Sequence, residues 1–469
     1  MNWNDDQSLA GIVQAVTEFK NTHEPVSGWA INGKASDACQ SLLLGGNANK
    51  LSVYQDREVD DLSYKVTLYV SSEDQREIGA SSATIQLGDD LQHQLEQIKA
   101  NASLAMNPAY PLAEQPNMPY LEVESYCPII VADMNLAHKK LIERVQQHAT
   151  HLQNVQVNSA ELYTNVHHHL LKTSKGIEAQ KITTDLYFEV AMELAPGPNL
   201  QEVLKYWHFV GVNDATVEVK LDEVAAETQL TTEAFMPPAR NKATILVDSY
   251  AISKIAAAIA SQLNGSAEYS QGPHLKPDDA LPNGEVDARS DVFNLTIDPA
   301  LKQMAKTSAF TDEGTVAEKA EVIVNNTVQQ QVLDTRLAHY LNKAPNGIYG
   351  NLVIPAGTAS RTELLNQVDE VIEILDFSSL LVNPSSLTWS SEIKLGRLYQ
   401  KGQSVKTLKG GIVSGNVRDS LTGFKFSSET TLRNTAGGYF EAASGYNGPT
   451  FMLMWKGITI AGETDQETL

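Results

Sequence analysis

The sequence predicts an α+β fold, with N-terminal helices on a mostly antiparallel sheet and a C-terminal β-rich domain whose sheet is bent or barrel-like. Two patterns support this prediction. In the first half, segments with apolar residues at helical spacing are interleaved with segments that alternate polar and apolar residues. Beyond residue 380, glycines are frequent between short apolar runs, and glycine permits the tight corners of a bent sheet. The 469 residues leave room for two or three domains of roughly 150 residues each.

The first half is predicted to contain three helices and several strands. Leu9, Ile12 and Val16 recur at helical spacing, which is typical of an amphipathic helix. Asp89 or Asp90 is placed to cap the first turn of a second helix. The predicted helices are residues 8–19, 89–104 and 133–152; the predicted strands are residues 64–70 and 83–87 and the alternating stretch 155–194, which turns at residues 174–176.

A break at residues 236–238, Met-Pro-Pro, separates the two halves, because adjacent prolines remove backbone donors and end regular structure. The predicted domains are residues 1–235, an α+β domain, and residues 236–469, a β-rich domain. In the second half a strand leads into a helix that Asp248 or Ser249 can cap. The predicted elements are a strand at 243–247, a helix at 248–263, an exposed loop at 266–285, strands at 293–297 and 321–324, and a helix at 362–375.

Acidic residues dominate the charge of the chain. Asp and Glu number 57 against 35 Lys and Arg, which gives a formal charge of −22. This charge repels phosphate backbones and anionic lipid surfaces, so neither a nucleic-acid nor a membrane partner is expected. No stretch approaches the ~20 apolar residues of a membrane span, and the N-terminus lacks the pattern of a secretory leader. Cys39 and Cys127 do not make a disulfide framework, so a cytoplasmic, reducing location is expected.

Known catalytic motifs do not occur in the sequence. The histidines form no His-Glu-x-x-His motif, and neither the Gly-x-Ser-x-Gly elbow nor a phosphate-binding loop is present. His167 and His169 would share one face of a strand, where they could bridge a metal ion or form a polar strand edge. His148 and His151 could chelate a metal from one helix or lie on its solvated face. These patterns alone predict no catalytic residue and no metal ligand.

A set of motifs in the second half resembles a known family. In order, they are Phe-Asn-Leu-Thr-Ile-Asp-Pro at 293–299, Asp-Glu-Gly at 312–314, Ala-Glu-Val-Ile-Val-Asn-Asn at 320–326 and Lys-Gly-Gly-Ile-Val-Ser-Gly-Asn at 409–416. This arrangement resembles the TldD/PmbA family, also called modulators of DNA gyrase, over roughly residues 150–465. The resemblance implies a cytoplasmic, heterodimeric metallopeptidase system that acts on unfolded or leader-bearing peptides. In it the TldD-type subunit holds zinc through His-Glu-x-x-x-His on a helix and a late cysteine, and the PmbA/TldE-type subunit lacks these ligands.

At the decisive helix this sequence departs from the TldD pattern. Asp248 and Ser253 lie near the positions of the family's two histidines, and no cysteine follows Cys127. The resemblance therefore implies a PmbA/TldE-like, non-catalytic subunit with no cofactor of its own, since zinc is expected on a TldD-like partner. The partner is a TldD-like metallopeptidase subunit or a second copy of this chain, together with a peptide substrate. Six positions are predicted to line the substrate cleft: Asp248, Ser253, Gly410, Gly411, Ser414 and Asn416.

Other interpretations stay open from the sequence. The glycines could let a peptide backbone approach closely, or they could form tight turns in a bent sheet. The chain could be a self-sufficient peptidase with an atypical site, for example a metal ion on His167 and His169. It could also be a non-proteolytic binding protein that acts on gyrase or on a toxin. The sequence leaves open whether the chain has activity without a partner.

Overall fold

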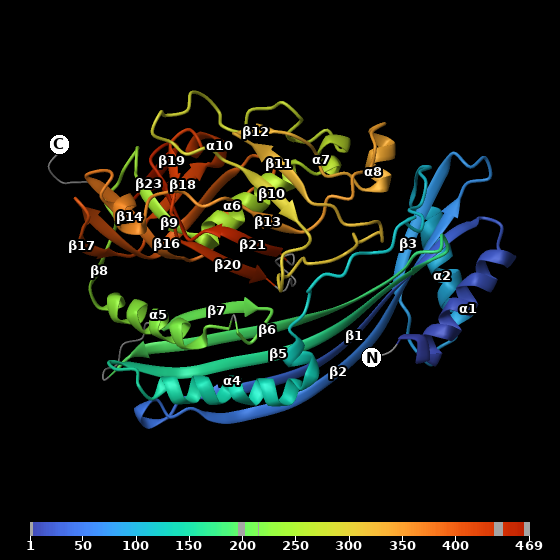
Figure 1. The fold of residues 1–469 in the computed structure, drawn as a ribbon, viewed down its shortest axis with the longest axis horizontal. Coiled ribbons are helices and arrows are strands. Elements are labelled where there is room, and N and C mark those ends of the chain that lie inside the picture. Colours follow the sequence, from blue (N-terminus) through green and yellow to red (C-terminus); the bar gives the residue numbers. More distant parts are fainter. Residues whose placement is uncertain (1–2, 196–201, 214, 436–443, 464–469) are drawn as a thin grey trace.

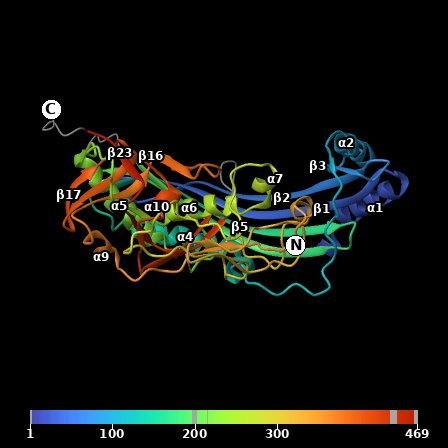
Figure 2. The same cartoon turned by 90° about the horizontal axis from the view of Figure 1, so that it is seen from above.

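The computed structural model describes residues 3–195, 202–213, 215–435 and 444–463. It is an α+β structure, as predicted. Figure 1 shows the long strands of the N-terminal half running beneath a β-rich body formed by the C-terminal half. Figures 1 and 2 both place the first two helices at one end of this elongated molecule and strand β17 at the other.

The N-terminal half is built on an antiparallel sheet in the order β7-β6-β5-β1-β2-β3-β4. The predicted turn at residues 174–176 is confirmed: it joins two long neighbouring strands, β5 and β6, and Gly176 supplies a positive φ of 85°. The strands are β1 (Val26–Leu44), β2 (Ser52–Ser71), β3 (Glu77–Thr84), β4 (Met106–Pro108), β5 (Val155–Thr173), β6 (Glu178–Leu194) and β7 (Val203–Phe209).

Helices cover the apolar face of this sheet. Asp6, Asp90 and Asp133 cap three of them by accepting a backbone N–H in the first turn, which satisfies donors that have no partner inside the helix. The first two helices share one apolar core with β1 and β2, and the later ones share a second core with β5 and β6. The helices are α1 (Gln7–Thr22), α2 (Leu91–Leu104), α3 (Pro128–Ala132), α4 (Met134–Ala149) and α5 (Val217–Leu230).

The C-terminal half surrounds a central helix with short strands. That helix, α6, follows β9 directly and buries its apolar side in the largest core of the described chain. Its companions are the short helices α7 (Gly265–Tyr269), α8 (Thr335–Tyr340), α9 (Arg361–Leu365) and α10 (Val417–Ser420). The strands and the central helix are β8 (Ala234–Phe235), β9 (Ile245–Asp248), α6 (Ser249–Gln262), β10 (Leu295–Asp298), β11 (Ala320–Val324), β12 (Thr327–Val328), β13 (Asn351–Val353), β14 (Glu370–Phe377), β15 (Leu381–Val382), β16 (Thr388–Gln400), β17 (Gln403–Leu408), β18 (Ile412–Asn416), β19 (Phe424–Phe426), β20 (Thr430–Thr435), β21 (Ser444–Pro449), β22 (Phe451–Met454) and β23 (Ile458–Ala461).

The two halves meet at a narrow seam in the backbone. Strand β20 of the C-terminal half pairs with β7 of the N-terminal half through one residue pair, Asn434 with His208, among the described residues. The largest core contains buried residues from Ala243 to Ile460, whereas the two N-terminal cores contain none beyond Ala225. This separation supports a domain boundary near residue 236, which we keep as a proposal.

Several predicted elements need correction. The C-terminal sheets are mixed and are not closed into a barrel. Strand β3 ends at Thr84, so the predicted strand 83–87 stops early. Part of the predicted loop 266–285 is helical, because Asn264 caps α7. The predicted helix 362–375 is a five-residue helix, α9, followed by strand β14.

The structure also bears on a membrane span. None of the helices in the described part of the chain combines the length and the apolar character that crossing a bilayer requires.

Candidate functional site

The start of α6 holds two of the predicted cleft residues. Strand β9 ends at Asp248, whose Oδ1 accepts the backbone N–H groups of Tyr250 at 3.1 Å and Ala251 at 3.4 Å. The hydroxyl of Ser253 donates to the Tyr250 carbonyl oxygen at 2.8 Å. Both side chains are half-buried. Asp248 is therefore the N-cap of α6, and Ser253 is bonded to the helix backbone.

Positive charges surround this helix start. Burial raises the pKa of Asp248, and Arg433 and Lys205 oppose that shift. The guanidinium carbon of Arg433 lies 4.8 Å from the centre of the Tyr250 ring, and Lys254 Nζ lies 5.4 Å from it. An anion that approached Tyr250 would meet two cations there.

These residues do not fit a catalytic zinc ion. Such an ion takes three protein ligands from histidine nitrogen, cysteine sulfur and carboxylate oxygen. Here the helix offers one carboxylate, already engaged as a cap, and a hydroxyl, and its sequence contains no histidine or cysteine. Over the residues with a described position, no three His, Cys, Asp or Glu side chains gather as a metal site would require.

The glycine-rich segment lies elsewhere, in the turn from β17 to β18. Gly410 and Gly411 both have positive φ, 84° and 68°. A Cβ on Gly411 would lie 2.6 Å from Pro237 Cγ and 2.7 Å from the Ala461 carbonyl oxygen. Glycine is needed here because the turn packs against the connector between the two halves. A tight turn accounts for both glycines without a peptide ligand.

Ser414 and Asn416 follow on β18. The hydroxyls of Ser414 and Thr459 share a hydrogen bond of 2.8 Å across to β23. Asn416 caps α10 through its Oδ1, and its Nδ2 donates to the Ser386 carbonyl oxygen at 3.2 Å. In the described chain, no hydrogen bond links Ser414 or Asn416 to the residues at the start of α6. The six predicted positions thus fall into two groups, one at the start of α6 and one along the turn and strand at 410–416.

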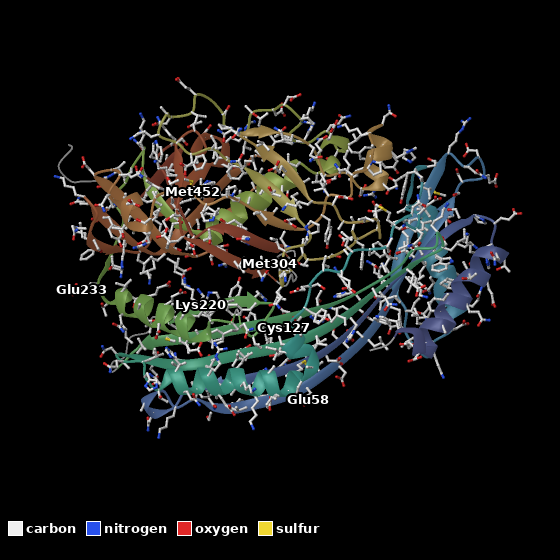
Figure 3. All side chains as sticks on the ribbon, in the orientation of Figure 1. Glu58, Cys127, Lys220, Glu233, Met304 and Met452 are labelled. Atoms are coloured by element: carbon white, nitrogen blue, oxygen red, sulfur yellow. The ribbon has the colours of Figure 1, made fainter. Side chains whose placement is uncertain are left out.

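A charged cavity of about 250 Å³ lies where the two halves meet. Lys205 of β7 pairs with two of its lining residues, with Nζ 3.0 Å from Glu227 Oε2 on α5 and 3.1 Å from Asp376 Oδ1 on β14. Lys394 of β16 pairs with the other oxygen of Asp376 at 3.0 Å. The cavity is lined by Glu202, Val203, Glu227, Thr231, Asp376, Lys394, Leu395 and Lys409. Figure 3 places Lys220, on the same helix as Glu227, on the side of the N-terminal half that faces the C-terminal body.

The electrostatics of this cavity couple it to the start of α6. Burial would lower the pKa of Lys205, but Glu227 and Asp376 outweigh burial and raise it. Burial raises the pKa of Glu227 despite the ion pair. Because Lys205 and Asp248 also influence each other, the cavity and the helix start form one electrostatic unit. The sequence did not indicate this cavity, since its ion pairs join residues far apart in the chain.

The predicted histidine pair, His167 and His169, lies on β5, where alternate residues share one face of the N-terminal sheet. The rings of His167 and His169 are 6.1 Å apart. Each ring shares a hydrogen bond with a hydroxyl group. His167 is 2.8 Å from the Ser36 hydroxyl, and His169 is 3.1 Å from the Thr183 hydroxyl. Burial lowers the pKa of His167 to about 4 and of His169 to about 3, and nearby lysines add to both shifts. These lysines disfavour a metal cation at the pair.

The second predicted histidine pair has a bonded member. His148 Nε2 lies 2.7 Å from Asp222 Oδ1, and its ring centre is 6.5 Å from that of His151. His148 therefore joins α4 to α5 rather than lying on a purely solvated helix face.

Solved structures share this architecture. A Bacteroides thetaiotaomicron protein described as a candidate modulator of DNA gyrase matches with a TM-score of 0.75 and 16% identity, over 98% of this chain and 100% of that one. TldE from Thermococcus kodakarensis matches with a TM-score of 0.74 and 15% identity, over 96% of this chain and 100% of that one. A Thermotoga maritima protein, also described as a candidate gyrase modulator, matches with a TM-score of 0.72 and 13% identity, over 96% of this chain and 100% of that one. At these identities the likeness shows the fold: a long antiparallel sheet joined to a β-rich half.

Sequence comparison identifies the family. Residues 240–462 match the family described as the PmbA/TldA metallopeptidase C-terminal domain. Residues 240–462 therefore belong to the PmbA/TldD family, as the order of the motifs predicted. No curated protein matches the sequence.

Proposed function

We propose that this chain is a PmbA/TldE-like, non-catalytic subunit that pairs with a TldD-like zinc metallopeptidase and holds unfolded or leader-bearing peptide for it. The observation that carries the proposal is the start of α6. Asp248 is engaged as a helix cap and Ser253 is bonded to the helix backbone, where a catalytic relative would present zinc ligands. The family assignment and the similarity in fold to TldE support the same role.

The charged cavity fits a holding role better than a cutting one. Two of its carboxylates, Glu227 and Asp376, are paired with lysines, so neither is poised as a free general base. Backbone groups of an extended peptide would supply most of the affinity, because main-chain hydrogen bonds are tolerant of sequence. A partner subunit that carries the zinc would then cut the held segment.

Reconstitution tests the proposal. The chain is mixed with a TldD-type subunit encoded in the same genome, and complex formation is followed by size-exclusion chromatography. We expect a stable complex, at least a tenfold gain in cleavage of an unstructured peptide over either subunit alone, and zinc only on the partner by elemental analysis. In the control, the partner's motif glutamate is replaced by glutamine, which should keep the complex and abolish cleavage.

Two results would contradict the proposal. Stoichiometric zinc on this chain alone, together with chelator-sensitive cleavage, would support the self-sufficient peptidase. Failure to bind the TldD-type subunit, together with capture of purified gyrase, would support the non-proteolytic binding protein.

A further inference from the structure

Strand β2 has an open edge. It pairs with β1 from Ser52 to Val70, but with β3 only from Lys65 onward. Residues 52–63 therefore have a strand neighbour on one side only within the described structure. Residues 52–62 are all exposed. Figure 1 shows β2 along the lower margin of the molecule, and Figure 3 labels Glu58 at that margin.

The open edge presents unused main-chain hydrogen-bonding groups. In an antiparallel pair, about every second residue of a strand directs its N–H and C=O away from its neighbour. Over residues 52–63 those outward groups meet no other described segment. At roughly 3.3 Å per residue the edge is close to 40 Å long. An extended polypeptide can add to such an edge as a further strand.

The side chains along the edge select what can be added. Residues 52–63 contain four carboxylates and one arginine, and Arg57 Nε is bonded to Gln40 Oε1 at 2.7 Å. Asp60 lies directly opposite Asp37 on β1, a like-charge pair that is destabilising unless a cation lies near. Glu58 is on the same face, two residues away. An identical acidic edge from a second copy would be repelled, whereas basic side chains would be attracted.

We propose that the open edge of β2 binds an extended polypeptide segment with basic residues at alternate positions, as an added strand. Alternate residues of a strand share one face, so basic residues at that spacing all meet the face of Glu58 and Asp60. Exposed apolar side chains at Tyr54 and Leu62, 71% and 38% exposed, lie on either side of these carboxylates in the sequence and add contact area. The proposal rests on the function above, in that it names the class of peptide held.

Three short peptides test the strand addition. The first alternates lysine with threonine, the second has the same composition with its lysines in one block, and the third is the alternating peptide with N-methylated backbone nitrogens. Binding to the chain alone is measured by fluorescence anisotropy at low salt. We expect the alternating peptide to bind at least tenfold more tightly than the N-methylated one and several-fold more tightly than the block peptide. Hydrogen exchange should slow within residues 52–63.

A pair of charge variants tests the location. The double variant E58Q/D60N removes two carboxylates that make no hydrogen bond or ion pair in the described structure. Exposed ion pairs are individually weak, so the loss of two of them should weaken binding of the alternating peptide about two- to thirtyfold. The matched control, E73Q/E285Q, makes the same charge change at exposed sites elsewhere and should alter binding less than twofold.

Each contrary result overturns the proposal. Equal binding of the N-methylated peptide would mean attraction by net charge without strand addition. Equal weakening in the control pair, or no binding of the alternating peptide at millimolar concentration, would remove the edge as the site. Because these measurements use no peptidase, such a result leaves the reconstitution test of the paired subunit standing, and failure of reconstitution leaves edge binding measurable.

Discussion

Asp248 shows how much a single side chain decides in this chain. The sequence predicted it as a helix cap and as the position near a relative's zinc ligand, and the structure confirms the cap. The cap could be predicted because its cause is local: an aspartate that precedes an apolar helix can accept the free N–H groups of the first turn. Its electrostatic environment could not, since Lys205 and Arg433 come from distant strands.

The buried histidines predict a pH-dependent stability. In the folded chain burial lowers the pKa of His167 to about 4 and of His169 to about 3, whereas an unfolded histidine has a pKa near 6.5. Below pH ~6.5 the unfolded chain therefore binds more protons than the folded one, and stability falls as the pH decreases. We expect a loss of about 3 kcal/mol between pH 6.5 and 5 from this pair, with about half of it from each histidine.

Urea unfolding at several pH values measures this effect. The variant H167Q/H169Q should lose much of the slope of stability against pH. The control H93Q changes an exposed histidine on α2 and should keep the wild-type slope. An unchanged slope in the double variant would show that other groups cause the acid sensitivity.

At the scale of elements, local pattern predicted helices well and short strands poorly. Helices α1, α2, α4 and α6 follow from spacing and caps. In contrast, the residues of β14 were predicted as helix because Val371, Ile372 and Ile374 fit either period. These residues form a strand because they pair with β9 on one side and β16 on the other. The local sequence carries no signal of that pairing. Helix α5 was not predicted, since its contact with α4 depends on Arg144 binding Glu218 across the chain.

The turn between β17 and β18 gives a prediction at this scale. G411A should lower the free energy of unfolding by about 2–4 kcal/mol, because a Cβ there meets Pro237 and the Ala461 carbonyl in addition to the cost of positive φ. G88A is the matched control: its φ is +98°, but a Cβ there meets nothing within 4 Å, so about 1 kcal/mol is expected. Chemical denaturation measures both. If the two variants lose equal stability, the contact with the connector does not constrain the turn.

At the scale of the whole molecule, Lys205 joins the two halves. It pairs with Glu227 on the N-terminal side and Asp376 on the C-terminal side, and all three side chains are at most 21% exposed. Neither the cavity nor this lysine emerged from the sequence, because Lys205 lies in a short strand among aromatic residues and its partners are set by how the halves dock.

Replacing that lysine tests the docking. K205M leaves Glu227 buried without its cation, so we expect a loss of about 3 kcal/mol in unfolding free energy and a less cooperative transition. K205M/E227Q should recover part of the loss, since the uncompensated charge is gone. K175M, which removes an exposed pair with Glu114 inside the N-terminal half, should cost less than about 1 kcal/mol. Equal losses for K205M and K175M would mean that the lysine does not hold the halves together.

In the described part of the chain β7 and β20 share one residue pair, and this has a mechanical consequence. Strands joined along many pairs must share one twist, and that twist accumulates across a sheet. Where the pairing narrows to Asn434 and His208, the twist of one sheet is only weakly coupled to the twist of the other. Each half therefore sets its own strand twist. The angle between them then depends mainly on side-chain contacts, which include the ion pairs of Lys205 at one place and the packing of Phe310 against Leu171 and Ile177 at another.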